Sequence, residues 1–87
     1  AADLAVAAAL VSSYRNRPIP HGVLVMGEVG LTGEVRRIAS PERRIKDAMN
    51  LGFKRFVLPM GKLSLDEPCN GIVQVKTLEE ALDKVFA

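Results

Sequence analysis

The chain has 87 residues, so it is long enough for one folded domain and too short for a second. Hydrophobic residues make up 48% of it but aromatic residues only 5%, so its core must be built from Val, Leu, Ile and Ala. Twelve Lys and Arg against ten Asp and Glu give a formal net charge of +2, too small by itself to indicate a polyanionic partner.

The charge is distributed unevenly along the chain. Seven Lys and Arg face two carboxylates between Arg36 and Arg55, whereas three Lys face five carboxylates from Lys62 onward. The single Cys69 excludes an intramolecular disulfide, and no zinc site can be assembled. The longest apolar run, Leu4 to Val11, is too short to span a bilayer and lacks the basic flank of a signal peptide. We therefore expect a cytoplasmic protein with no membrane partner.

The segment from Ala2 to Arg15 is apolar on nearly every side, which predicts a buried helix. Arg17-Pro18 predicts its end, because proline disfavours helix at the preceding residue. Such a helix needs cover on more than one face, which a partner subunit or further chain could supply. Because the sequence starts at Ala1 without methionine and directly in a helical pattern, we expect a piece of a longer protein.

Alternating aliphatic residues predict a β-hairpin with strands from His21 to Val29 and from Gly33 to Ile38. Gly27, Gly30 and Gly33 give the backbone freedom that turns and bulges need. They do not form a phosphate loop, because no helix N-terminus with Lys-Ser/Thr follows them.

A second helix is predicted to begin at Pro41, with Ser40 as N-cap, and to close at Gly52. Its expected buried stripe is Ile45, Ala48 and Met49.

Two further strands are predicted from Arg55 to Pro59 and from Ile72 to Val75, separated by a loop. A capping box at Thr77 to Glu80 opens a closing helix. The apolar residues of this helix recur at helical spacing: Leu78, Ala81, Leu82, Val85 and Phe86. The predicted element order is α-β-β-α-β-β-α, an α+β fold without an internal repeat.

No set of residues by itself indicates catalysis. His21 is the only conventional base, and no serine lies in a recognisable nucleophile elbow. Glu28 and Glu34 could be imagined as an acid and base pair, but carboxylates in a hairpin are usually turn or salt-bridge residues.

The basic stretch carries the functional prediction. Its side chains end a strand and continue onto the next helix, so several could converge on one face that binds phosphates: Arg36, Arg37, Arg43, Arg44 and Lys46. The alternative is that Arg43 and Lys46 pair with acidic residues one turn away, while the rest are merely solvated. No stacking aromatic residues are interleaved, so base-specific readout has little support.

Three stretches, taken together, resemble the C-terminal domain of the RadA (Sms) family of bacterial DNA repair and recombination proteins. They are Gly27-Glu-Val-Gly-Leu-Thr-Gly-Glu-Val-Arg36, Arg44-Ile-Lys-Asp-Ala-Met-Asn-Leu-Gly-Phe-Lys-Arg55 and Pro59. That domain is similar to the proteolytic domain of Lon, with the fold of ribosomal protein S5 domain 2. Residues 1–87 are thereby expected to form one partial Lon-protease-like domain, because the family has strands before its first helix that are absent here.

Lon-type peptidases use a Ser-Lys dyad. An ungapped alignment through Arg17-Pro18 and Pro59 places the serine position at or near Ala1 and the lysine position at Glu42. Alanine has no nucleophile, and a carboxylate is poorly suited to replace a neutral lysine base. The resemblance therefore implies no catalytic residue, cofactor or metal in this chain, with ATP and zinc expected in other domains of a larger protein.

The resemblance implies a non-proteolytic scaffold domain of a RadA-type DNA-dependent ATPase. Such a domain helps to form a hexameric ring and contacts duplex or branched DNA, here through Arg36, Arg37, Arg43, Arg44 and Lys46. Further copies of itself, DNA and, as a candidate, the RecA recombinase are the implied partners. Two alternatives remain open: an active Lon-type Ser-Lys peptidase with a displaced dyad, and an oligomerisation module without DNA contact.

Overall fold

The structure is a computed structural model that describes residues 2–65 and 69–86. In these ranges three helices and six short strands form a small mixed α/β architecture with two three-stranded sheets. Helices and strands are combined as the sequence predicts, but a strand precedes the first helix and three strands follow it. None of the helices in the described ranges is both long enough and apolar enough to cross a membrane.

The central sheet is parallel and has the order β2-β5-β6. Its strands are β2 (Val23–Val25), β5 (Arg55–Pro59) and β6 (Ile72–Val75), of which β5 and β6 have the predicted bounds. Strand β5 is buried on both faces, as expected of a continuous apolar run in a parallel sheet.

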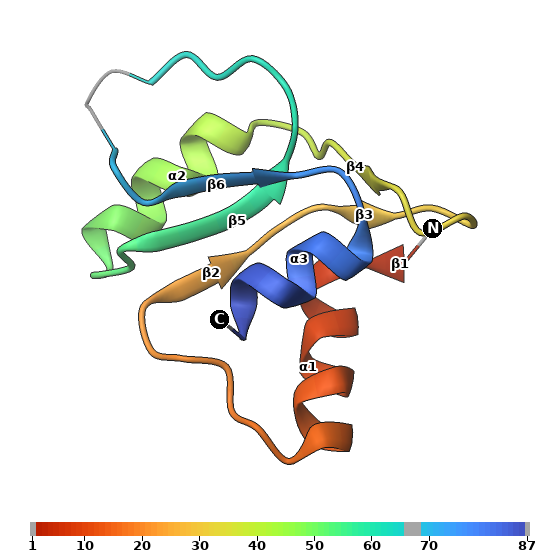
Figure 1. Ribbon diagram of the computed structural model, residues 1–87. Coiled ribbons are helices and arrows are strands. Elements are labelled where there is room, and N and C mark those ends of the chain that lie inside the picture. Colours follow the sequence, from red (N-terminus) through yellow and green to blue (C-terminus); the bar gives the residue numbers. More distant parts are fainter. Residues whose placement is uncertain (1, 66–68, 87) are drawn as a thin grey trace.

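Helices cover both faces of this sheet (Figure 1). Helices α1 (Leu4–Arg15) and α3 (Leu78–Val85) lie on one face and α2 (Pro41–Asn50) on the other. Alternate residues of β5 divide between the two cores, with Val57 in the α1/α3 core and Phe56 and Leu58 in the α2 core. Packing on the sheet thereby fixes the orientation of α2. The side of α2 turned away from the sheet, which we call its outer face, is exposed to solvent.

The predicted strand from His21 to Val29 is wrong, because it divides between two sheets. Its first half is β2, and its second half, β3 (Glu28–Val29), joins β1 (Ala2–Asp3) and β4 (Val35–Arg36) in an antiparallel sheet. The chain changes sheet at Gly27, where φ is +142° and an added Cβ would lie 3.1 Å from Pro59 and Val35 side chains.

The first helix starts two residues later than predicted, because Ala2 and Asp3 pair with β3. Asp3 is the N-cap, and its Oδ1 accepts hydrogen bonds from the backbone N–H groups of Ala5 (2.7 Å) and Val6 (3.2 Å). The Lon serine position predicted at Ala1 lies outside the described residues.

The sequence predicts that α1 is buried on nearly every side, and this prediction is wrong. Leu4 and Ala8 are fully buried, but Val6, Leu10 and Tyr14 are exposed. The described residues cover α1 on one side only. The α3 helix and the central sheet pack against that side, and no second layer of the described chain covers the other.

The ends of α2 agree with the prediction in part. Ser40 precedes the helix, but it adopts a left-handed conformation (φ 51°, ψ 53°) in which its side chain makes no capping hydrogen bond. At the other end Gly52 (φ +97°) donates to the Met49 carbonyl, and Phe53 donates to the Ala48 carbonyl, both at 3.0 Å. This is a Schellman closure, which confirms the predicted role of Gly52.

Two smaller predictions also need qualification. Of the expected buried stripe of α2, Ile45 and Ala48 are buried, whereas Met49 is only half-buried. Thr77 caps α3 by accepting from the Glu80 N–H (3.1 Å), but the Glu80 carboxylate accepts from Lys76 rather than from Thr77 itself.

Candidate nucleic-acid interface

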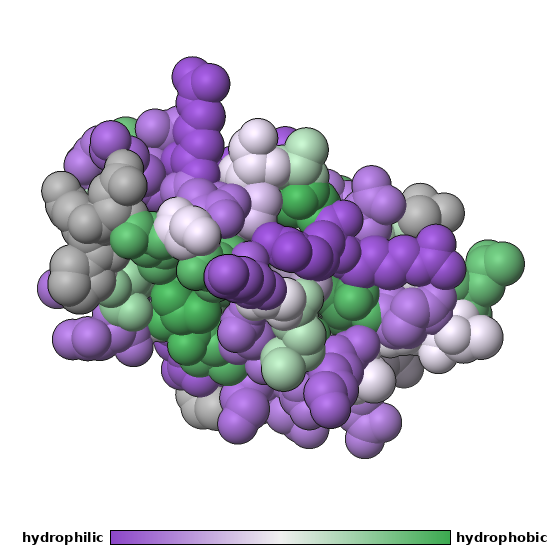
Figure 2. All heavy atoms as spheres, turned by 90° about the horizontal axis from the view of Figure 1, so that it is seen from above, coloured by the Kyte–Doolittle hydropathy of each residue, from purple (hydrophilic) through white to green (hydrophobic). Residues whose placement is uncertain are grey.

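The outer face of α2 carries the three basic residues that the sequence assigns to this helix. Packing of Ile45 and Ala48 against the central sheet leaves the rest of the α2 circumference to solvent, where Arg43, Arg44 and Lys46 are all exposed. Figure 2 views the molecule from above the orientation of Figure 1, and hydrophilic side chains cover much of that surface around patches of apolar surface.

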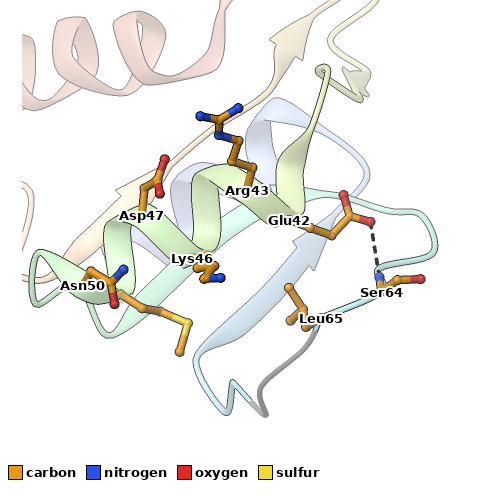
Figure 3. Close-up of a pocket in the computed structure, with 8 residues that line it drawn as sticks. Glu42, Arg43, Lys46, Asp47, Asn50, Ser64 and Leu65 are labelled. Atoms are coloured by element: carbon orange, nitrogen blue, oxygen red, sulfur yellow. Dashed lines mark hydrogen bonds between the residues drawn. The ribbon is translucent and has the colours of Figure 1, made fainter.

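A groove of about 610 Å³ separates α2 from the segment that follows β5. Arg43, Lys46 and Asn50 line its α2 side, and Ser64 and Leu65 line the other. In Figure 3 the Glu42 carboxylate points across the groove to Ser64, whereas Arg43 and Asp47 point away from that segment. The basic side chains of α2 therefore surround the helix instead of lining one pocket.

Local acidic partners do not neutralise these basic residues. Within residues 2–65 and 69–86 the structure has one ion pair, between Arg36 and Glu34, and neither Arg43–Asp47 nor Glu42–Lys46 comes within 4.0 Å. The alternative in which Arg43 and Lys46 are paired along the helix is therefore not what the structure shows.

Arg36 is engaged at the β3–β4 hairpin. Its Nη2 donates to Glu34 Oε1 at 3.1 Å, and the Thr32 hydroxyl donates to the other oxygen of the same carboxylate. The hydrogen bond from Thr32, followed by the backbone and by the charge of Arg36, lowers the pKa of Glu34. Glu34 is thus a salt-bridge residue, one of the two roles that the sequence favours, whereas Glu28 is an exposed residue of strand β3.

Arg37 holds a neighbouring segment in place. Its Nη2 donates to the Lys62 carbonyl at 2.9 Å, and its side chain lies against Gly61, where an added Cβ would be 2.8 Å from Cδ. Sequence reasoning missed this contact, since it joins residues 25 positions apart. The only signal in the chain was Gly61, which adopts φ +145° and leaves room for the guanidinium.

Glu42, which the alignment places at the Lon lysine position, anchors the same segment from α2. Its Oε2 accepts a hydrogen bond from the Ser64 N–H at 3.2 Å (Figure 3). Hydrogen bonds from its own backbone N–H and from Ser64, with the charge of Arg37, lower the pKa of Glu42. The group is therefore an ionised acceptor held by backbone amides.

Not every basic residue of the stretch converges on α2. Lys54 and Arg55 lie at the far end of the helix, where both backbone N–H groups donate to the Gly22 carbonyl. Arg44 faces a second, largely apolar hollow of about 380 Å³ between α2 and the start of α1. The structure thus distributes Arg43, Arg44 and Lys46 around one helix, with Arg37 beside its first turn and Arg36 on the hairpin.

Metal ligands do not gather anywhere in the part of the chain that the structure describes, where no three His, Cys, Asp or Glu side chains form a cluster that could hold an ion. The α2 surface carries arginine and lysine side chains, of a kind that binds phosphate groups, beside the exposed carboxylate of Asp47.

Comparison with known proteins gives the family. Residues 1–62 match the family model described as subunit ChlI of Mg-chelatase. The chain is 49% identical over 87 residues to the DNA repair protein RadA of Pseudomonas aeruginosa, covering 99% of this chain and 19% of that protein. It is 45% identical to RadA of Haemophilus influenzae and 44% identical to RadA of Escherichia coli, in each case over 93% of this chain and 18% of the relative.

The chain thus spans about a fifth of the length of these relatives. The resemblance to RadA found in the sequence is confirmed, and the family-model match fits the C-terminal region of RadA. The chain belongs to the family described as subunit ChlI of Mg-chelatase, and it is a relative of the DNA repair protein RadA.

Proposed function

We propose that this chain is a non-proteolytic, Lon-like scaffold domain of a cytoplasmic DNA repair protein, that it takes part in oligomer assembly, and that it binds duplex or branched DNA through the outer face of α2. Its fold is proposed to be a partial version of the ribosomal protein S5 domain 2 type. ATP and zinc would belong to other parts of the protein, and RecA is proposed only as a partner of the whole.

The observation that supports DNA binding is the free basic surface of α2. Arg43, Arg44 and Lys46 are exposed, and no carboxylate in the described residues pairs with them. Cations spaced along one helix contact phosphates without reading base edges, and the absence of aromatic side chains from this surface agrees with such binding. Arg36 and Arg37 are better described as supporting residues, because each already holds a protein acceptor.

The role of Glu42 supports the loss of peptidase chemistry. A lysine base must be neutral and aimed at a serine, whereas Glu42 is a carboxylate with a lowered pKa whose hydrogen bond goes to a backbone amide. The alternative of an active Ser-Lys peptidase would require a dyad elsewhere.

The test uses the natural full-length protein and fluorescent duplex and branched DNA. Arg43→Glu with Arg44→Glu is expected to weaken binding at least tenfold, and Lys76→Glu with Lys84→Glu is a control of equal charge change at a distance. Equal effects of the two double variants would rule out DNA binding by α2.

The peptidase alternative is tested by incubating the protein with an unfolded protein substrate, with and without ATP. Cleavage that a serine-directed inhibitor abolishes would support this alternative.

A further inference from the structure

Three side chains hold the backbone of residues 61–64, which we call the clamped segment. It begins at Gly61, whose carbonyl accepts a hydrogen bond from Gln74 Nε2 at 2.6 Å. Arg37 and Glu42 hold its next residues through the two hydrogen bonds described above. These clamps come from β6, from the residue after β4 and from α2, and they reach across 13, 25 and 22 residues of sequence.

The clamps fix a stretch of backbone that lies on the surface. Gly61, Lys62 and Ser64 are exposed, and only Leu63 packs partly against the α2 core. Ordering such a stretch costs conformational entropy, and little buried apolar surface offsets that cost. A surface segment that is held in advance suits binding, because its partner does not have to order it. The clamped segment is therefore a candidate contact surface.

The clamped segment lies across the groove from α2. Ser64 lines the groove opposite Lys46 and Asn50 (Figure 3). Lys62, two residues earlier, has an exposed side chain, and no carboxylate in residues 2–65 and 69–86 lies within 4.0 Å of its ammonium group. The segment thus adds a cation to the surface on which α2 carries its own.

The Glu42 carboxylate does not make this surface acidic. Its Oε2 accepts from the Ser64 N–H, and Arg37 lies close enough for its charge to lower the pKa of Glu42. A carboxylate paired in this way repels a nearby anion less than a free one does. The Asp47 side chain points away from the segment (Figure 3). Lys62 is therefore placed where a phosphate group can approach it.

We propose that Lys62 is a DNA contact, and that the clamped segment forms the second side of a surface whose first side is α2. A DNA strand carries a phosphate in every nucleotide, so a strand that crosses the groove presents phosphates to Lys46 on one side and to Lys62 on the other. The proposal rests on the DNA binding proposed above and adds to it a residue outside the helix. Arg37, Glu42 and Gln74 are positioning residues, which act by holding Lys62 in place.

The salt dependence of duplex DNA binding by the natural full-length protein tests this contact. Lys62→Gln is expected to make the slope of log affinity against log salt less negative by about 0.9, the value for one phosphate contact. Lys84→Gln removes the same charge from an exposed position on α3, beyond the central sheet, and is expected to keep the wild-type slope. If Lys62→Gln changes the slope no more than Lys84→Gln does, the proposal is overturned.

A neutral variant tests the positioning role. Gln74→Met removes the hydrogen bond to Gly61 without changing any charge, and it is expected to bring the slope toward that of Lys62→Gln, because Lys62 is then held less firmly. In the Lys62→Gln background the same replacement is expected to leave the slope unchanged. Equal effects in the two backgrounds, including no effect in either, would contradict the positioning role. Lys62→Gln changes only a surface side chain, so it tests the contact even where Gln74→Met lowers stability.

Arg43→Gln with Arg44→Gln, measured in parallel, separates this contact from DNA binding by α2. A slope that changes in this double variant but not in Lys62→Gln would overturn the contact and leave the proposed function standing. A slope that changes only in Lys62→Gln would support the contact and contradict the role of the two arginines. A slope that changes in neither would contradict both.

Discussion

The backbone N–H of Ser64 donates to Glu42 Oε2 at 3.2 Å, and this contact joins the first turn of α2 to the segment that follows β5. Arg37 holds the same segment from the other side, through the Lys62 carbonyl. A position that the Lon resemblance assigns to a catalytic lysine is thus occupied by an anchor for a loop.

Replacing this anchor by lysine should not restore peptidase activity. Glu42→Lys removes the acceptor of the Ser64 amide, so hydrogen exchange at Ser64 should become at least fivefold faster and no cleavage of an unfolded substrate should appear. Glu42→Gln retains an acceptor oxygen and should exchange more slowly than Glu42→Lys. Cleavage of the substrate by the Glu42→Lys variant would contradict the assignment of Glu42 as a structural anchor.

The Glu42 contact should weaken only in acid. Because the folded-state pKa of Glu42 is lowered below the ordinary value of 4.5, its contribution to stability is complete above about pH 4.5 and is lost as the pH falls through the lowered pKa. An NMR titration of the Glu42 carboxyl carbon should give a midpoint below 4.5. Arg37→Gln should move that midpoint upward, because it removes a positive charge that lowers the pKa of Glu42. A midpoint at or above 4.5 in the wild type would contradict the contact between Glu42 and Ser64.

Arg17 connects the loop after α1 to the end of α3. Its Nη2 donates to the Phe86 carbonyl at 2.7 Å, and its guanidinium lies 5.6 Å from the centre of the Phe86 ring. Arg17→Ala should therefore lower the free energy of unfolding by about 1–2 kcal/mol. Arg15 lies 6.0 Å from the same ring, and no hydrogen bond from its side chain is found in the described residues. Arg15→Ala should cost less in a urea titration, and equal losses would contradict the role of the hydrogen bond.

Gly71 is required by close backbone approach. A Cβ at this position would lie 1.8 Å from the Lys54 carbonyl oxygen, and the Gly71 carbonyl accepts from Phe56 in the central sheet at 2.8 Å. Gly71→Ala should thus destabilise the fold by about 2 kcal/mol or more. Asn70→Ala, next to it and exposed, should change stability by less than about 0.5 kcal/mol, and thermal unfolding of the two variants compares them.

The sequence predicted elements whose signals are local. Gly52 predicts the end of α2, because glycine readily adopts the left-handed conformation that follows a helix. Strand β5 was predicted from three consecutive apolar residues, Phe56, Val57 and Leu58. The prediction of a continuous strand through Gly27 failed for a nonlocal reason. The two halves of one alternating pattern pair with strands in different sheets.

The position of the three basic residues on one helix was predictable from the sequence, whereas the contacts of their neighbours were not. Arg43, Arg44 and Lys46 stand on one helix, so their common exposure follows from its buried stripe. The engagement of Arg37 with Lys62 and of Glu42 with Ser64 depends on contacts across 25 and 22 residues, which no periodicity reveals.

The salt dependence of DNA binding tests the central claim most directly. Affinity of the natural full-length protein for a duplex, measured by anisotropy over a range of salt concentrations, should fall linearly on logarithmic axes. Replacing Arg43, Arg44 and Lys46 by Gln should make that slope less negative by about 2–3, at roughly 0.9 per lost phosphate contact. The control variant, with Arg15, Lys76 and Lys84 replaced by Gln, loses the same charge and should keep the wild-type slope. Identical slopes for all three proteins would contradict DNA binding by α2.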